Sequence, residues 1–229
     1  EIENVNVDAL ERLEEEGIKV YPRASTLRTI QDKRRQKQFY LDHAIPTSPF
    51  FTYDTKADLL AKDLDFPCVQ KAAGGGYDGR GVNILRSRAD AEALPEGPGL
   101  IEGFVGNMKE ISVIVARRPI GDATTFPPVE MEFHPTANLV EFLISPTSLT
   151  SAEAEKAEQI ARKVAEDINL LGILAVEMFV TEAGEVLVNE SAPRPHNSGH
   201  HTIESNYTSQ YEQHVRAILD LPLGSTGAR

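Results

Sequence analysis

Residues 66–85 read FPCVQKAAGGGYDGRGVNIL, with apolar segments on either side of a glycine-rich stretch. The first segment, 66–73, is typical of a strand that runs into the loop, and the second, 81–85, is typical of a strand that leaves it. A Walker-type phosphate loop or a dinucleotide-binding turn would instead lead from a strand into a helix. We therefore predict a strand–loop–strand device.

The glycine-rich loop combines backbone freedom with charged and polar side chains. Glycine lets consecutive backbone N–H groups approach an anion closely, so such a loop can close as a lid over a triphosphate. Lys71, directly before the loop, would add a fixed positive charge. Tyr77, Asp78 and Arg80 could hold and orient a polar substrate, since arginine suits a carboxylate or phosphate. The alternative is a mobile hairpin tip, which the glycines alone would favour.

Residues 172–190, GILAVEMFVTEAGEVLVNE, predict a β-hairpin that carries two opposed acids. If the turn centres on Ala183-Gly184, Glu177 faces Glu190. Opposed carboxylates destabilise a sheet unless something positive bridges them, and Mg²⁺ accepts one or two carboxylates beside water and phosphate oxygens. Asn189 adds a neutral oxygen. Alternatively, one glutamate is exposed or paired with a lysine, and a bulge would break the register.

The segment 189–201, NESAPRPHNSGHH, is dense in polar side chains. A zinc site is one interpretation, but His196 and His200 share a face only on a helix, and Pro195 and Gly199 make a helix improbable there. A polar substrate loop containing Arg194 and His196 is the second interpretation. An ordinary hydrogen-bonded surface loop is the third.

The remaining pattern predicts alternating helices and strands, and so the α+β class. Thr150 and Glu153 form a capping box before an amphipathic helix. The expected helices are 28–44, 54–64, 87–94, 150–168 and 209–219, and the further expected strands are 1–5, 99–105, 110–118, 129–134 and 138–144.

Composition excludes several classes of function. The 229 residues include 35 acidic and 23 basic side chains, a net charge of −12, which gives little support for binding along a nucleic acid. One cysteine, Cys68, suits a reducing cytoplasm, and no apolar run is long enough for a membrane span. The chain starts without methionine in an apparent strand, so we expect a piece of a longer protein.

Several motifs together resemble the ATP-grasp superfamily and, within it, the 5-(carboxyamino)imidazole ribonucleotide synthetases of purine biosynthesis. The matching segments are EIENV at 1–5, GGYDGRG at 75–81, AVEMFV at 175–180, VNESAPRPHNSGHHTIE at 188–204 and TSQYEQHVRAILDLPLG at 208–224. They run nearly end to end in the family's order, and the combination of GGYDGRG with APRPHNSGH is highly specific.

The resemblance implies an ATP-grasp fold in which two α+β subdomains hold the nucleotide between them. The implied division is the end of an N-terminal nucleotide-fold domain with a linker (1–27), a subdomain with the glycine-rich lid (28–107, lid about 47–107), a subdomain with the metal and substrate site (108–222) and the start of a C-terminal segment (223–229).

The implied activity is a ligation driven by ATP and Mg²⁺, with Mn²⁺ as a substitute. Bicarbonate is phosphorylated to carboxyphosphate, which then carboxylates aminoimidazole ribonucleotide. The family also implies a homodimer. Two alternatives stay open: another ATP-grasp ribonucleotide ligase, such as a formate-dependent transformylase, and a non-catalytic nucleotide-binding fragment.

By similarity, most of the site divides into a nucleotide part and a metal part. The implied nucleotide residues are Lys33, Lys71, Gly75, Gly76, Gly79 and Gly81 near the phosphates, Glu102, Gly103, Phe104 and Val105 as the adenine hinge, Glu110 at the ribose, and His134, Asn189 and Glu190. Glu177 and Glu190 match the family's metal ligands. Tyr77, Asp78, Arg80, Arg194 and His196 would place bicarbonate or the aminoimidazole, with Glu3 as a weaker candidate.

Overall fold

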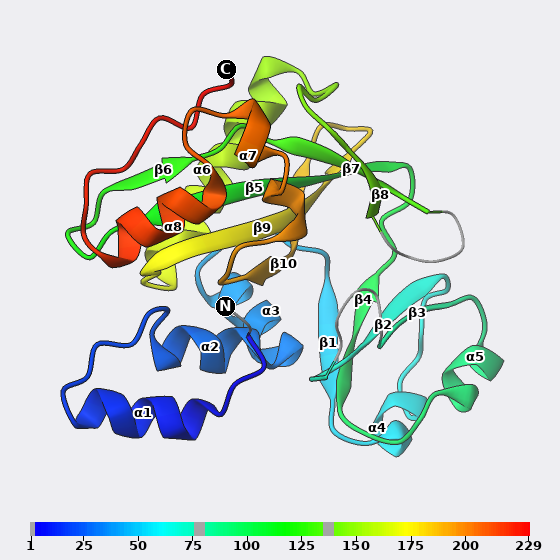
Figure 1. Cartoon of the computed structure of the whole chain (residues 1–229). Coiled ribbons are helices and arrows are strands. Elements are labelled where there is room, and N and C mark those ends of the chain that lie inside the picture. The colour runs from blue at the N-terminus through cyan, green and yellow to red at the C-terminus, as the bar shows by residue number, and fades with distance from the viewer. Residues whose placement is uncertain (1–2, 76–80, 135–139) are drawn as a thin grey trace.

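The computed structural model describes residues 3–75, 81–134 and 140–229, and its strands form two sheets with helices packed on their faces (Figure 1). The strands pair in antiparallel ladders, four in the smaller sheet and six in the larger one. This mixture of helices and antiparallel sheets confirms the predicted α+β class. Within the described residues, none of the helices combines the length and the apolar character that a membrane crossing requires.

The smaller sheet has the strand order β1-β4-β2-β3. Its strands are β1 (Phe50–Tyr53), β2 (Cys68–Ala72), β3 (Val82–Leu85) and β4 (Gly99–Gly103). Since β2 and β3 are antiparallel neighbours, the prediction of a strand on each side of the glycine loop is confirmed.

Two short helices, α4 (Lys56–Leu60) and α5 (Arg88–Ala93), close the apolar core of the smaller sheet (Figure 1). Leu59 of α4 and Ala91 of α5 are fully buried in this core. Helix α4 is shorter than the predicted 54–64, because Thr55 caps it one residue before Lys56 and the helix ends at Leu60.

The larger sheet has the order β10-β9-β5-β7-β8, with β6 paired to β5. The bounds of its strands are β5 (Met108–Arg117), β6 (Ala123–Thr125), β7 (Val129–Phe133), β8 (Val140–Ile144), β9 (Gly172–Thr181) and β10 (Val186–Ala192). Strand β9 lies between β5 and β10 and is almost continuously apolar, which fits a strand with both faces covered.

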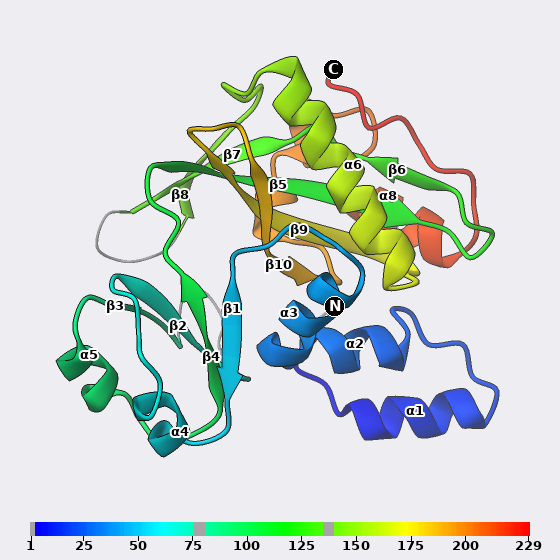
Figure 2. The same cartoon turned by 180° about the vertical axis from the view of Figure 1, so that it is seen from behind.

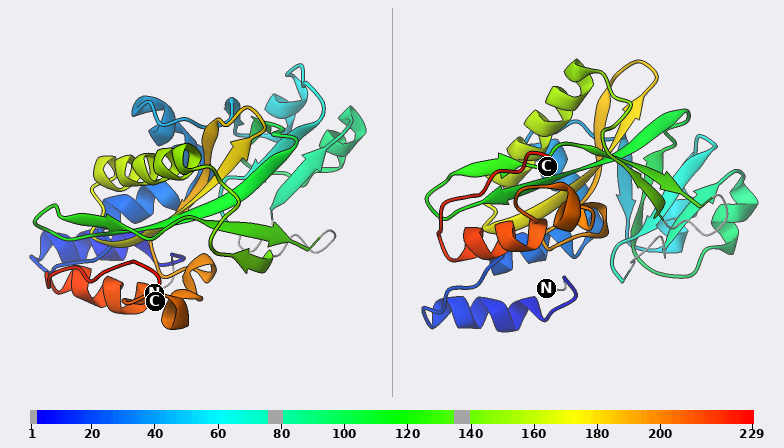
Figure 3. Two further views of the ribbon diagram at one scale, coloured as in Figure 1. Left: turned by 90° about the horizontal axis from the view of Figure 1, so that it is seen from above. Right: turned by 45° about the horizontal axis from the view of Figure 1, so that its top comes forward.

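Helices cover the larger sheet on both faces, as the view from above shows (Figure 3). Helix α6 (Ser151–Asp167) packs across β5 and β9 on one face (Figure 2), and α8 (Gln210–Ile218) packs on the same two strands from the other. The capping box of Thr150 and Glu153 is confirmed. The short α7 (Thr202–Ser205) precedes α8.

The N-terminal part of the chain is helical, and two predictions about it are wrong. Residues 3–6 form no strand; they lead into α1 (Val7–Glu15), which Asn6 caps. The predicted helix at 28–44 is two helices, α2 (Ala24–Ile30) and α3 (Lys33–Asp42). The break occurs because the Asp32 side chain accepts from the backbone N–H of Arg34 and starts a new helix.

Candidate active site

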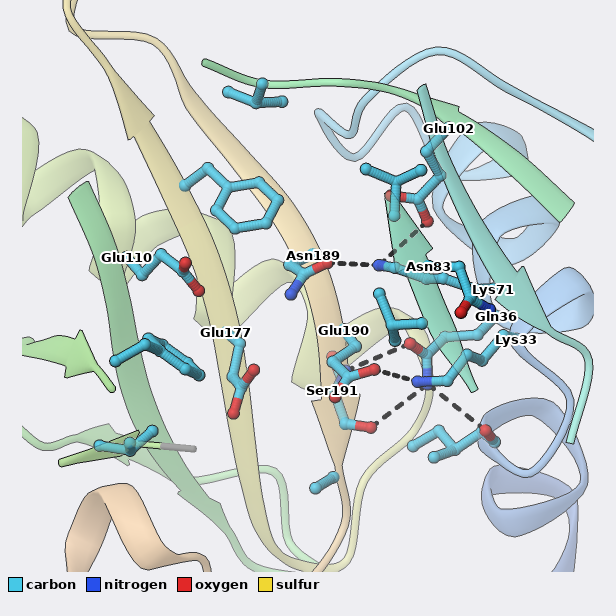
Figure 4. Close-up of a pocket in the computed structure, with 18 of the residues that line it drawn as sticks. Lys33, Gln36, Lys71, Asn83, Glu102, Glu110, Glu177, Asn189, Glu190 and Ser191 are labelled. Carbon is cyan, nitrogen blue, oxygen red and sulfur yellow. Dashed lines mark hydrogen bonds and ion pairs between the residues drawn. The ribbon is translucent and has the colours of Figure 1, made fainter. Parts of the chain in front are cut away.

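A cavity of about 720 Å³ is lined by residues of both sheets (Figure 4). Strands β2, β3 and β4 line one side, and β5, β7, β9 and β10 line the other. The predicted site residues that reach it are Lys33, Lys71, Gly75, Glu102, Gly103, Phe104, Val105, Glu110, His134, Glu177, Asn189, Glu190, Arg194 and His196. Folding therefore gathers residues from the whole length of the chain.

The β9–β10 hairpin places Glu177 directly opposite Glu190, as predicted. Near the turn, however, Val186 pairs with Val180, one residue away from the expected alignment. A β-bulge between Val188 and Glu190 adds one residue to β10 and realigns the strands. The predicted pairing of Glu177 with Glu190 is thus confirmed, and the bulge does not separate the two acids. The regular strand register from which the pairing was predicted is wrong.

The turn itself explains the shifted register. The Thr181 N–H donates to the carbonyl of Glu185 at 2.9 Å, so three residues, 182–184, lie between this hydrogen-bonded pair instead of the expected two. Gly184 takes φ +77°, a conformation that favours glycine at this position.

The two carboxyl groups have contrasting electrostatic surroundings. Burial and the negative charge of Glu190 raise the pKa of Glu177 to about 8. Burial also opposes ionisation of Glu190, but Lys33 and Lys71 lower its pKa to about 2, and Lys33 donates a hydrogen bond to Oε2 of Glu190. Of the two acids, Glu177 therefore holds a proton more readily than Glu190.

A third acid, Glu110, lies on the next strand. Glu110, Glu177 and Glu190 stand on β5, β9 and β10, which are adjacent in the sheet (Figure 4). Burial raises the pKa of Glu110 to about 7. This row of acids places carboxyl oxygens along one wall of the cavity.

The opposite wall carries Lys71, at the end of β2. Its Nζ donates to Asn189 Oδ1 at 2.6 Å and forms an ion pair with Glu102 Oε1 at 3.2 Å. Asn189 is the residue inserted by the bulge, so its amide reaches across to the smaller sheet (Figure 4). Lys71 therefore connects the two sheets at the cavity and presents a cation beside the acidic wall.

His196 lies next to the acidic wall as a neutral ring. Its Nε2 is 3.4 Å from Glu177 Oε1, and its Nδ1 is 2.9 Å from Ser198 Oγ, which in turn contacts Ser112 Oγ at 2.8 Å. The backbone N–H of Ser198 donates to Nδ1 at 3.3 Å, which assigns the proton to Nε2. Burial and Arg194 lower the pKa of His196 to about 4.

Arg194 meets the N-terminal segment at the rim of the cavity. Its Nη2 lies 3.4 Å from Glu3 Oε1, and both residues line the cavity. Gln31 holds this segment in place by donating to the backbone carbonyls of Glu3 and Val5 at 2.5 and 2.8 Å. The irregular segment that replaces the predicted first strand thus brings Glu3 to the site.

The cavity also carries apolar side chains from both sheets. Its lining includes Val69, Ile84, Phe104, Met108, Phe133 and Phe179. An apolar region beside a charged one suits a ligand with a planar ring at one end and anionic groups at the other.

Six predicted site residues are not among the described residues that line the cavity. Gly76, Tyr77, Asp78, Gly79 and Arg80 lie outside the described residues. Gly81 is described but does not line the cavity; its carbonyl accepts from the N–H of Ala72 at 2.9 Å and closes the base of the β2–β3 pair.

The zinc interpretation of the histidine-rich segment finds no support. Among the described residues, no group of three or more His, Cys, Asp or Glu side chains could hold a metal ion. His200 stacks on Tyr211 with ring centroids 6.4 Å apart, whereas His196 points to Glu177.

Sequence reasoning missed two residues of α3. Gln36 accepts from the N–H of Ser191 and donates to its carbonyl, both at 3.2 Å, so it covers the free edge of β10. Lys37 reaches Glu102 and is buried. Lys37 follows Lys33 by four residues, a spacing that puts both on one helix face and could have indicated its proximity to the site.

A comparison of the sequence with family models matches the ATP-grasp domain over residues 38–211. This chain belongs to the ATP-grasp family. The match begins within α3 and ends at the second residue of α8, and it includes every described strand of the two sheets that line the cavity. ATP-grasp membership thus agrees with a cavity that has lysines on one wall and acids on the other.

Several relatives of this ATP-grasp chain are named N5-carboxyaminoimidazole ribonucleotide synthase or synthetase. The chain is 40% identical to the N5-carboxyaminoimidazole ribonucleotide synthase of Bacillus subtilis, over 99% of this chain and 60% of that protein. Among solved structures, the N5-carboxyaminoimidazole ribonucleotide synthetase of Thermotoga maritima matches with a TM-score of 0.87 and 41% identity, over 100% of this chain and 59% of that one.

A further solved structure carries ligands. The Aspergillus clavatus N5-carboxyaminoimidazole synthase in complex with ADP and 5-aminoimidazole ribonucleotide matches with a TM-score of 0.89 and 32% identity, over 100% of this chain and 61% of that one. The chain therefore spans about 60% of the length of these relatives.

Proposed function

We propose that this chain belongs to an N5-carboxyaminoimidazole ribonucleotide synthase, which carboxylates 5-aminoimidazole ribonucleotide with bicarbonate at the expense of ATP in purine (IMP) biosynthesis. The observation that carries the proposal is the similarity of nearly the whole chain to proteins of that name. The cavity is consistent with it, because it offers an apolar end for a base, lysines for phosphates and acids for a cation.

The reaction would proceed in two transfers. An oxygen of bicarbonate attacks the γ-phosphorus of ATP, the bond to the β-phosphate oxygen breaks, and ADP leaves with carboxyphosphate as the product. The amine nitrogen then attacks the carbon of carboxyphosphate, phosphate leaves, and the nitrogen loses a proton. Lys33 and Lys71 would attract the phosphates, since fixed positive charge stabilises transferring phosphoryl groups.

The donor set of the acidic wall fits a magnesium ion. Glu177 and Glu190 supply two carboxylates, and Asn189 supplies an amide oxygen next to them. Magnesium typically takes one or two carboxylates and completes its shell with water and phosphate oxygens, and manganese accepts the same ligands. When bound, the ion would neutralise phosphate charge. A bound cation would also offset the burial and the repulsion from Glu190 that raise the pKa of Glu177.

Arg194 and His196 are the proposed contacts for the second substrate. Arg194 offers a planar cation to a carboxylate or phosphate, and His196 offers the Nε2–H as a donor. Tyr77, Asp78 and Arg80 keep their predicted role in placing bicarbonate or the aminoimidazole. Accordingly, Asp78→Asn should impair turnover with aminoimidazole ribonucleotide more than it impairs ATP binding.

Three further predictions about the whole protein join the proposal. We propose a homodimer located in the cytoplasm that binds small molecules and neither nucleic acid nor membrane. We also propose the subdomain boundaries 27, 107 and 222, with the lid at about 47–107. The passage from one sheet to the other between β4 and β5 is consistent with the boundary at 107.

The test combines binding with turnover. ADP release from Mg²⁺-ATP should require both bicarbonate and aminoimidazole ribonucleotide, and formate should not replace bicarbonate. Turnover with formate would assign the chain to a transformylase, and turnover with an unrelated amine alone would exclude the proposal. Nucleotide binding by calorimetry without turnover would favour a binding fragment.

A further inference from the structure

A buried ion cluster borders the cavity. Lys37 of α3 and Glu102 of β4 have side chains that are only 2% and 3% exposed, and Lys37 Nζ lies 3.2 Å from Glu102 Oε1. Lys71 Nζ lies 3.2 Å from the same oxygen. Lys71 lines the cavity described above, whereas Lys37 does not.

The ammonium group of Lys37 is held by three different elements. It donates to Thr47 Oγ1 at 2.5 Å and to the carbonyl of Val188 at 3.3 Å, in addition to its ion pair with Glu102. Val188 is the residue at which the β10 bulge begins. Lys37 is therefore fixed between α3, the small sheet and the hairpin, next to Glu102 but not among the residues that line the cavity.

The charges of this cluster do not cancel. Two ammonium groups share one carboxylate, which leaves an excess of one positive charge in a region with little solvent. If Glu102 had Lys71 as its sole cation, the two would neutralise each other and Lys71 would lose its attraction for an anion. Because Coulomb energies rise steeply where water is excluded, the presence of Lys37 changes the field at Lys71.

We propose that Lys37 is a positioning residue for nucleotide binding, which neutralises Glu102 so that the charge of Lys71 stays directed at the phosphates. The proposal rests on the proposed function insofar as it assumes a phosphate-bearing ligand. A purely structural role explains the geometry less well, because a buried ion pair contributes little net stability compared with apolar side chains of similar volume.

The test is a double-mutant cycle read by nucleotide affinity. Lys37→Met should weaken ADP binding, measured by calorimetry, by at least about tenfold, because Glu102 then neutralises Lys71. In a Glu102→Gln background, Lys37→Met should weaken ADP binding by less than about threefold, because no carboxylate at position 102 is left for Lys37 to neutralise. Adenosine, which lacks phosphates, should bind Lys37→Met as it binds the wild type, and the exposed Lys156→Met is the matched control.

The outcomes separate this proposal from the proposed function. Unchanged ADP affinity of Lys37→Met, or an equal loss in both backgrounds, would overturn the role of Lys37. An equal loss for ADP and adenosine would do the same, because it would indicate a disrupted pocket. If the wild-type chain binds no nucleotide, both the proposed function and the role of Lys37 are excluded. Should Lys37→Met fail to fold, Lys37→Gln keeps a polar group for Thr47 and carries the same comparison.

Discussion

Glu177 and Glu190 face each other across the β9–β10 hairpin because a bulge at Asn189 shifts one strand by a residue. A regular hairpin with the observed turn would instead set Asn189 against Glu177 and turn Glu190 to the opposite face of the sheet. The bulge also aims the Asn189 amide at Lys71, so one irregularity places an acid and a lysine partner together.

Glu190→Gln should weaken metal-dependent turnover. The amide keeps the shape of the side chain but loses the charge that binds a divalent cation, so the Mg²⁺ concentration for half-maximal ADP release should rise at least about tenfold. The matched control is Glu185→Gln, an exposed acid on the same hairpin, which should have no effect. An unaltered metal dependence of Glu190→Gln would show that the wrong carboxylates were assigned.

Glu177 should make the stability of the metal-free protein fall as pH rises. Its pKa is raised in the folded state to about 8, so the folded protein holds a proton that the unfolded chain releases near pH 4.5. The stabilisation is complete below pH 4.5 and is lost as pH rises through 8. The difference in free energy of unfolding between wild type and Glu177→Gln, measured by urea titration with a chelator, should therefore decrease over that interval. A difference in free energy of unfolding that stays constant over this pH interval would contradict the raised pKa of Glu177.

Gly99→Ala should destabilise the smaller sheet and disturb Lys71. A Cβ at this position would lie 2.6 Å from the backbone oxygen of Lys71 and 2.5 Å from the Tyr53 hydroxyl oxygen, so the strands must move apart. We expect a loss of about 1–3 kcal/mol in the free energy of unfolding, with weaker ADP binding. In the control Gly106→Ala, the nearest atom lies 3.5 Å away, in ordinary contact. Equal stability of the two variants would refute the packing argument.

Ser198→Ala should impair turnover more than nucleotide binding. The Ser198 hydroxyl and the Ser112 hydroxyl behind it orient the His196 ring from the Nδ1 side, and neither serine lines the cavity. We expect about a tenfold loss in turnover with little change in ADP affinity, as for other residues that orient a functional histidine. The ring ¹⁵N shifts of His196 should also change. Ser225→Ala, an exposed serine, is the control.

Local patterns predicted much of the fold. The strands on both sides of the glycine loop and the α6 capping box follow from neighbouring residues, since turn chemistry, caps and periodicity act over a few positions. The prediction of one continuous helix at 28–44 is wrong for an equally local reason, because Asp32 caps a second helix. The strand at 1–5 was wrong because residues 3–6 gain no neighbouring strand and are held instead by Gln31.

The same distinction between local patterns and long-range contacts applies to the candidate site. By itself the sequence indicated which residues meet at the cavity, namely the acids of the hairpin, Lys71, Arg194 and His196, through their residue types, their spacing and the family resemblance. Only the tertiary structure decided that a bulge restores the Glu177–Glu190 pair and that Glu102 is shared by Lys37 and Lys71. Such contacts join residues far apart in the chain, and their geometry depends on how the two sheets and α3 pack together.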